Sequence, residues 1–426
     1  MGCEEVALSK LLCAVVDNRG KTCPTATTGI PLIATNCVRN DLLYPTYEKA
    51  RFVSQETHDS WFRGHPEPGD ILFVNKATPG RVCLAPEPVD FCIAQDMVAL
   101  RADERRVYPR YLFAALRSPI VQKRIEQMHV GSLIPHFKKG DFDKLLVPIP
   151  VRRDQEFIGD TYFDLSSKPE LNRRRNQTLE AMARALFKDW FVDFGPVRAK
   201  MEGREPYLPA DLWQLFPDRL DDEGKPEGWS ERPLDEIADF LNGLALQKFP
   251  ATDLGDSLPV IKIAELRNGV SAKSDRASRE VPAKYIIKDG DFLFSWSGSL
   301  LATFWTQGEG ALNQHLFKVS SESYPMWFVS HWVHHHLEEF QAIAASKATT
   351  MGHIQRGHLK AAMTLCPPGE MLERLGVVMA PLVEQSIHNE LESRTLAQLR
   401  DTLLPKLISG ELRIADPERF IEERAG

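Results

Sequence analysis

The chain carries one stretch twice, half a chain apart. Residues 176–191 read NQTLEAMARALFKDWF and residues 393–408 read SRTLAQLRDTLLPKLI. Aligning Thr178 with Thr395 and Leu186 with Leu403 gives the same offset of 217 residues in a chain of 426. Because self-similarity at a fixed period decides an architecture before any local pattern does, this repeat is the strongest constraint on the fold.

Further landmarks recur in the same order at nearly the same offset. They are 68–73 (PGDILF) with 289–294 (DGDFLF), Gln95-Asp96 with Gln314-His315, Tyr108-Pro109 with Tyr324-Pro325, and His136 and Gly140 with His353 and Gly357. Between these landmarks the side chains differ almost everywhere. The sequence therefore predicts one scaffold that is present twice and carries two different surfaces.

Each half begins with short apolar runs broken by Gly, Pro and Asn, which predict strands, and continues with a helical pattern. The predicted strands are 30–34, 70–74, 91–100, 260–264, 291–296 and 312–319, and the predicted helices are 108–128 and 327–345. Pro119 must bend or interrupt the first of these helices. Each half is therefore predicted to be a compact α+β domain.

Each domain is followed by a run of 38 residues with apolar side chains at steps of three and four, 154–191 and 371–408. At ~1.5 Å per residue each run would extend about 57 Å, so each needs a partner for its apolar stripe. We expect the two helices to pair antiparallel as a coiled-coil spacer and to relate the domains by a pseudo-twofold axis. Pro169 removes a helix hydrogen bond and predicts a kink or a split in the first helix.

The predicted fold is thus α+β, with two similar globular domains joined by two long antiparallel helices. The predicted layout is a first domain at 1–150, a central helix at 151–194, a linker at 195–228, a second domain at 229–369, a C-terminal helix at 370–410 and a tail at 411–426. The residues expected at an interface, either between the two helices or with a partner subunit, are Leu179, Met182, Leu186, Trp190, Leu391, Leu399, Leu403 and Leu407.

Composition narrows the class of protein. The apolar fraction of 43% is ordinary for a globular protein, and no run approaches the ~18 apolar residues of a membrane span. Glu4 and Glu5 stand where an export signal would be basic, and the seven cysteines contain no Cys-x-x-Cys pair, so we expect a cytoplasmic protein with reduced, mostly buried thiols. The net charge of −7 argues against a protein that coats nucleic acid.

Motifs for catalysis are missing. The sequence has no glycine-rich nucleotide loop, no Walker motif and no Asn-Pro-Pro-Tyr-type tetrapeptide, so we expect no catalytic residue in this chain. His331, His335 and Glu339 share a helix face at steps of four, which would suit a metal. The repeat places apolar or small residues at the corresponding positions of the first half, and the His-Glu-x-x-His order is absent, so we expect no metal site. A metallohydrolase that uses these histidines is the alternative.

Three segments, together with the duplicated layout, resemble the specificity subunit of type I restriction-modification systems. They are ALFKDWFVDFGPVRAK at 185–200, PEGW at 226–229 and LPKLISGELRI at 404–414. The helix around Lys168-Pro169 departs from the family pattern, in which this helix is unbroken.

The resemblance implies two target recognition domains, each reading one half of an asymmetric bipartite site on double-stranded DNA. It implies that the helices space the two readers and dock two methyltransferase (modification) subunits, and that restriction/translocase subunits join the complex. S-adenosylmethionine, ATP and Mg would then be bound by the partner subunits, and this chain would hold no cofactor and contact no membrane. A coiled-coil scaffold without sequence-specific DNA binding is the second alternative.

The candidate DNA contacts lie in polar loops that follow buried strands, and in a turn close to the long helices. Asn and Arg suit contacts to adenine and guanine, and Lys and Ser suit phosphates or base edges. The candidates are Asn75, Lys76, Thr78, Arg81, His136, Lys138 and Lys139 in the first half, and Ser295, Trp296, Ser297, Ser299, His353, Gln355 and Arg356 in the second. Weaker candidates are Arg39, Asn40, Lys273, Arg276 and Arg279. Solvated hairpin turns and turn-capping histidines are the competing interpretation.

Overall fold

The computed structural model of the protein describes residues 4–18, 21–47, 50–128, 135–253, 255–346 and 352–412. These residues form two compact units. Unit 1 comprises Met1–Leu171 with Ser393–Gly426, and unit 2 comprises Asn172–Glu392. Each unit combines one globular domain with one part of each long helix. Of the predicted tail, residues 413–426 lie outside the described ranges.

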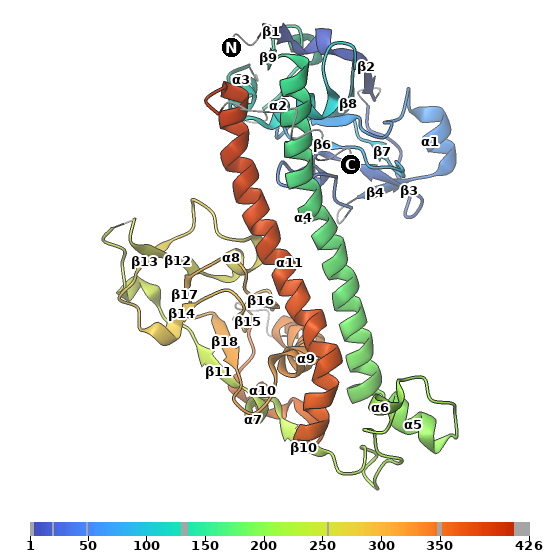
Figure 1. Ribbon diagram of the computed structural model, residues 1–426, viewed down its shortest axis with the longest axis vertical. Helices are drawn as coiled ribbons and strands as arrows, with labels where there is room; N and C mark the ends of the chain where they lie inside the picture. Colours follow the sequence, from blue (N-terminus) through green and yellow to red (C-terminus); the bar gives the residue numbers. More distant parts are fainter. Residues whose placement is uncertain are drawn as a thin grey trace. The chain divides into compact units, whose positions relative to one another are not determined.

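Unit 1 is built on two sheets, which Figure 1 shows in blue. The first has the order β2-β8-β5-β6 with antiparallel neighbours, and the second has the order β4-β3-β7, in which β3 and β7 run parallel. The antiparallel pair of β1 and β9 ties the start of the chain to the end of the domain. The strands are β1 (Glu4–Ala7), β2 (Leu12–Asp17), β3 (Ile30–Ile33), β4 (Arg51–Val53), β5 (Ile71–Val74), β6 (Val82–Leu84), β7 (Cys92–Ile93), β8 (Met97–Ala102) and β9 (Leu146–Ile149). The helices are η1 (Leu8–Leu11), η2 (Thr35–Cys37), α1 (Gln55–Trp61), α2 (Pro109–Arg117), α3 (Pro119–Met128) and η3 (Lys139–Asp141).

Two details of unit 1 follow from local chemistry. The strand predicted at 91–100 is divided into β7 and β8, because the backbone at Asp96 turns toward β5 and its carbonyl accepts from the Asn75 N–H (2.9 Å). The helix predicted at 108–128 is interrupted as expected. Pro119 starts α3, and the Ser118 hydroxyl accepts from the Val121 N–H at the new helix start.

Unit 2 repeats this arrangement. Its sheets have the orders β11-β18-β15-β16 and β13-β12-β17-β14, with β12 and β17 parallel, and β10 pairs with β19 as β1 pairs with β9. The strands are β10 (Ser230–Pro233), β11 (Asp239–Asn242), β12 (Ser257–Ile261), β13 (Arg276–Ser278), β14 (Ile286–Ile287), β15 (Phe292–Ser295), β16 (Ala302–Phe304), β17 (Gly310–Leu312), β18 (Leu316–Ser320) and β19 (Met363–Cys366). The helices of its globular part are α7 (Leu234–Ile237), η5 (Leu246–Lys248), α8 (Ile263–Asn268), η6 (Ala283–Tyr285), α9 (Met326–Ser346) and α10 (Arg356–Ala361). The predicted α+β fold with an internal repeat is therefore confirmed.

Two long helices accompany the domains, α4 (Arg152–Phe187) and α11 (Gly369–Ser409). Pro169 lies inside α4, which continues through it, so the predicted split is wrong. A proline in a helix interior costs about 3 kcal/mol. Ser166 and Glu170, which flank it, are both buried, and we attribute the continuity of the helix to packing on either side of the proline.

The two long helices run antiparallel in unit 2, and they also contact each other in unit 1. In unit 2 the Asn172 amide donates to the Asn389 carbonyl (3.2 Å), and the Asn176 amide, one turn later, donates to the Ser386 carbonyl (3.1 Å), earlier in α11. In unit 1 the Arg400 guanidinium lies 5.9 Å from the centre of the Tyr162 ring. Buried polar side chains therefore line the helix contact where a continuous apolar stripe was predicted.

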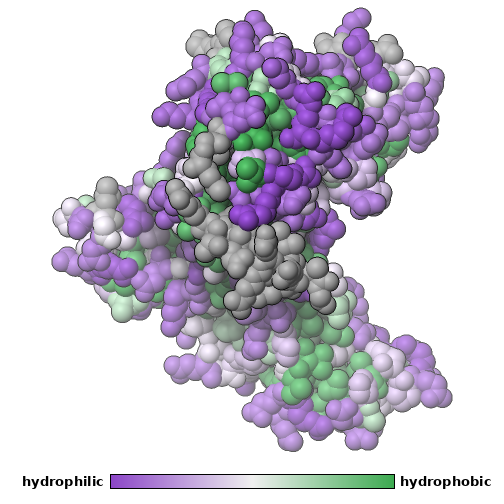
Figure 2. Space-filling view, turned by 45° about the horizontal axis from the view of Figure 1, so that its top comes forward, coloured by the Kyte–Doolittle hydropathy of each residue, from purple (hydrophilic) through white to green (hydrophobic). Residues whose placement is uncertain are grey.

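The predicted helix-interface residues divide into two groups. Met182 and Leu399 are 49% and 46% exposed, so they lie outside the buried contact between the two helices. Leu179, Leu186, Leu391 and Leu403 are half-buried, and Trp190 and Leu407 are buried. Figure 2 shows hydrophobic areas on a largely hydrophilic face of the protein.

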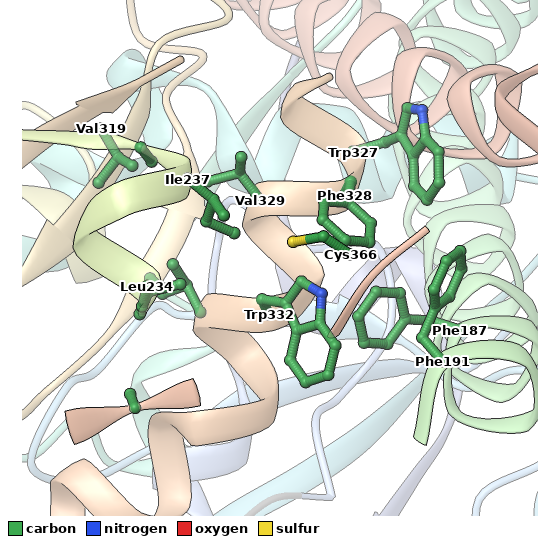
Figure 3. Close-up of a cluster of buried hydrophobic side chains, with 14 of the residues drawn as sticks. Phe187, Phe191, Leu234, Ile237, Val319, Trp327, Phe328, Val329, Trp332 and Cys366 are labelled. Carbon is green, nitrogen blue, oxygen red and sulfur yellow. The ribbon is translucent and has the colours of Figure 1, made fainter. Parts of the chain in front are cut away.

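The core of unit 2 joins its globular part to the end of α4 (Figure 3). Phe187 and Phe191, the latter on the π-helix η4 (Lys188–Val192), pack against Trp327, Phe328 and Trp332 of α9. The segment after α4 also contributes, since Val197 on α5 (Gly195–Met201), Leu212 on α6 (Ala210–Trp213) and Phe216 are buried in the same cluster. The predicted linker at 195–228 is thus folded against the domain that follows it.

Candidate nucleic-acid interface

In unit 1 two of the predicted candidate segments meet. The loop after β5 forms an antiparallel bridge between Lys76 and His136. The Ala77 N–H donates to the Pro135 carbonyl (3.0 Å), and the Phe137 N–H donates to the Asn75 carbonyl (2.8 Å). We call this arrangement the loop bridge of unit 1.

Unit 2 has the same feature at the equivalent place. The loop after β15 forms an antiparallel bridge between Ser297 and His353. The Gly298 N–H donates to the Gly352 carbonyl (2.7 Å), and the Ile354 N–H donates to the Trp296 carbonyl (3.0 Å). The predicted segments are therefore brought together twice, by the same hydrogen bonds, in the loop bridges of the two units.

A shared backbone conformation shapes both loop bridges. Ala77 has φ +68° and Gly298 has φ +64°, at equivalent positions directly after the bridging residue. The left-handed conformation costs an alanine roughly 1 kcal/mol and a glycine almost nothing. Retention of the turn with an alanine in unit 1 indicates that the loop bridge holds it in place, and backbone strain of this kind clusters at functional sites.

Alternation along the bridging segment turns one side chain inward and the next outward. Phe137 is fully buried and packs against Phe73 and Phe142 at ring distances of 5.7 Å, whereas the neighbouring His136 is exposed. In unit 2 Ile354 is buried, and His353 lies edge-on to the Trp296 ring at 6.3 Å. In each unit the residue after the bridging histidine is therefore anchored in the hydrophobic core.

Some of the predicted candidates have structural roles instead of an open surface. Asn75 is only 5% exposed, and its amide donates to the Phe137 carbonyl (3.1 Å). Ser295 is fully buried, and its hydroxyl bonds within the loop to the Ser299 carbonyl (2.9 Å). Ser297 is 3% exposed. Burial favours a role for these three in shaping the loops over direct contact with a base.

The cations beside the loop bridges are also partly engaged. Lys139 forms an ion pair with Asp17 at the end of β2. Arg356, its equivalent in unit 2, donates to the Phe240 carbonyl on β11 (3.3 Å), and the Gln355 side chain caps α10. Lys138, Arg81 and Ser299 are exposed, whereas Thr78 and Trp296 are half-buried.

The weaker candidates are held by neighbours within the protein. Asn40 accepts from the Val82 N–H (2.8 Å), and Arg39 pairs with Asp41. Arg276 donates to the Ser257 hydroxyl (2.9 Å), and Arg279 pairs with Asp256 and Glu309. Lys273 is exposed. These contacts explain most of this basic set without nucleic acid.

His331, His334 and His336 of α9 have backbone partners. The Nδ1 of His331 lies 2.6 Å from the Trp327 carbonyl oxygen, and burial lowers the pKa of His331 to about 4. The Nε2 atoms of His334 and His336 lie 3.0 Å and 2.9 Å from the carbonyl oxygens of Ala302 and Met363. His331 and His334 border a cavity of about 870 Å³ between α4, α9 and α11. Within the described ranges no group of three His, Cys, Asp or Glu side chains is placed to hold a metal.

The sequence reasoning missed two side chains beside the loop bridges. Asp96 lies 4.0 Å from the Lys76 ammonium, and the His315 Nδ1 lies 3.1 Å from the Ser297 hydroxyl. Both residues belong to a landmark of the internal repeat. In this landmark the glutamine is repeated, whereas the next residue changes from Asp to His. That change is the signal that could have identified both residues from the sequence.

The structure thus combines a duplicated scaffold with two equivalent loops of different chemistry. Residues 21–181 and 226–368 match the family described as the type I restriction modification DNA specificity domain. The chain belongs to this family.

Alignments with two members of this family extend over most of the chain. The type I restriction enzyme MjaIX specificity subunit of Methanocaldococcus jannaschii is 25% identical over 369 residues, which are 82% of this chain and 78% of the relative. The HindI specificity subunit of Haemophilus influenzae is 26% identical over 400 residues, 81% and 86% of the two chains. The crystal structure of the S subunit from M. genitalium shares the fold, with a TM-score of 0.56 at 14% identity over 96% of each chain.

As far as the chain is described, none of its helices combines the length and the apolar character that a membrane crossing requires.

Proposed function

We propose that this specificity-family chain reads an asymmetric, bipartite site on double-stranded DNA, one half with each unit. The observation that carries the proposal is the pair of loop bridges, in which one backbone geometry places Lys76 beside Asp96 in unit 1 and Ser297 beside His315 in unit 2. The same backbone geometry with different side chains suits two domains that bind different DNA sequences. A symmetric dimer of one reader would be limited to palindromes.

We further propose that the chain acts as a non-catalytic subunit. Two methyltransferase subunits would dock on the long helices, and restriction/translocase subunits would join them. S-adenosylmethionine, ATP and Mg would belong to these partners, which also supply much of the contact to phosphate, because the chain carries a net charge of −7. The cytoplasm, where such DNA lies, is the proposed location.

Methylation mapping of DNA modified by the reconstituted complex tests the proposal. The expected result is one asymmetric site made of two specific parts separated by unspecified base pairs. A palindromic site, or methylation independent of sequence, would contradict it. The second of these results would favour the scaffold alternative.

A further inference from the structure

Each loop bridge has a pair of side chains beside it. In unit 1 the pair is Lys76 and Asp96, whose charged atoms lie 4.0 Å apart. In unit 2 it is Ser297 and His315, with 3.1 Å between hydroxyl and ring nitrogen. The positions are equivalent, since the residue before the bridge donates its N–H to the carbonyl of Asp96 in one unit (Asn75, 2.9 Å) and of His315 in the other (Trp296, 3.3 Å).

The bridging histidine, in contrast, is the same in both units. His136 and His353 occupy equivalent positions on equivalent hydrogen-bonded backbone. Two readers of different half-sites meet the same sugar-phosphate backbone but different base edges. A group common to both readers therefore suits the backbone, and a group that differs between them suits the bases.

The chemistry of the unit 1 pair narrows the base pair that it fits. In the major groove guanine presents the acceptors O6 and N7, which lysine and arginine bind, and cytosine presents an amino donor, which aspartate and glutamate accept. A carboxylate is repelled by phosphate, so an aspartate at a DNA interface is suited to a base amino group. The Lys76 and Asp96 side chains are 43% and 40% exposed, which leaves both within reach of a ligand.

We propose that Lys76 and Asp96 together read a G·C base pair in the first half-site, and that His315 fills the equivalent reading position for the second. The buried Ser297 hydroxyl holds the His315 ring, which is half-buried. This inference rests on the proposed function, because it assigns specificity within the same DNA-reading surface.

The test uses the full chain in complex with its modification subunits, and the variants Lys76→Gln and Asp96→Asn, which keep size and remove charge. Binding is measured on the mapped site, on a set of sites with each base pair of the first half replaced in turn, and on random DNA. Matched controls are Lys123→Gln and Glu104→Gln, which change exposed side chains of unit 1.

The expected result is a loss of about tenfold or more on the mapped site for each variant, with binding to random DNA unchanged. Among the substituted sites, the one that lacks the G·C pair read by Lys76 and Asp96 should bind the wild-type complex and both variants with equal affinity. The sequence preference in the second half-site should be unchanged in both variants. The control variants should bind like wild type.

Three results would overturn the inference. They are variants that bind the mapped site like wild type, an equal loss on mapped and random DNA, and a first half-site without any G·C pair. All three presuppose that the wild-type complex recognises a bipartite site. Wild-type binding without sequence preference would instead refute the proposed function itself.

Discussion

Replacing Asn389 by leucine should destabilise unit 2 although it places an apolar side chain at a buried position. Asn389 is 2% exposed and Asn176 is 4% exposed. The Asn389 amide donates to the side-chain oxygen of Asn176 (2.8 Å). The change removes this hydrogen bond and the one that Asn389 accepts from the Gln385 amide (2.8 Å), each worth about 0.5–1.5 kcal/mol, and it leaves the buried Asn176 oxygen without this donor. We expect the free energy of unfolding to fall by about 2 kcal/mol.

The double variant Asn176→Leu/Asn389→Leu should cost less than the sum of Asn176→Leu and Asn389→Leu, because the bond between the two amides is lost only once and neither amide is left without the other. The exposed neighbour His388→Leu on the same helix is the control and should change stability by less than about 0.5 kcal/mol. In this cycle the coupling between Asn176 and Asn389 should be about 1 kcal/mol or more.

Urea unfolding followed by tryptophan fluorescence measures these changes in the right place, since seven of the eight tryptophans lie in unit 2 and Trp61 alone lies in unit 1. With a slope of about 2 kcal/mol per molar urea, the midpoint for Asn389→Leu should fall by about 1 M. An additive double variant, or a single variant as stable as wild type, would refute the view that this amide pair supports the helix contact.

Three further predictions concern other parts of the molecule. Arg117 is 7% exposed and donates to the carbonyls of Val82 and Leu42. Arg117→Met should therefore destabilise unit 1 by about 3 kcal/mol or more. Amide hydrogen exchange in β6 and α2 should become faster, and unchanged exchange would contradict this prediction. Burial lowers the pKa of His331 to about 4 from an ordinary value near 6.5, so the folded state favours the neutral imidazole. The stability that His331 contributes is therefore present above pH ~6.5 and is lost as the pH falls toward 4. His331→Gln should flatten this part of the pH profile of unit 2, and an unchanged profile would exclude His331 as its source. Arg81 is exposed in the loop after β5, and Arg81→Ala should weaken binding to the cognate site by about 1–3 kcal/mol but not binding to random DNA; an equal loss on both would reassign the residue to phosphate contact.

Much of the fold could be predicted because it depends on patterns that repeat. The offset between Thr178 and Thr395 revealed two copies of one scaffold, and periodic apolar residues revealed the long helices. The polar contact could not be predicted, because the amides of Asn172, Asn176 and Asn389 look like ordinary exposed helix residues until their partner across the contact is known. Pro169 was misjudged for a related reason, since the burial of the polar residues Ser166 and Glu170 beside it cannot be read from their types.

The candidate site was predicted at the level of segments but not of side chains. Loops after buried strands and the turns around His136 and His353 were expected to be functional, and the structure brings each loop to its turn. Their individual roles depend on which side chain points inward, and alternation along a two-residue bridge is invisible in a sequence without strand context. Asn75 and Ser297, both polar, are therefore buried, whereas Asp96 became a candidate only through its distance to Lys76.

Exchange of the second domain tests the central claim most directly. Residues 229–369 would be replaced by the corresponding domain of another specificity subunit with a known and different site, and the methylated sequence would be mapped with the same modification subunits. Two independent readers predict that one half of the site changes to that of the donor while the other half stays as in wild type. A change in both halves, or in neither, would contradict the account.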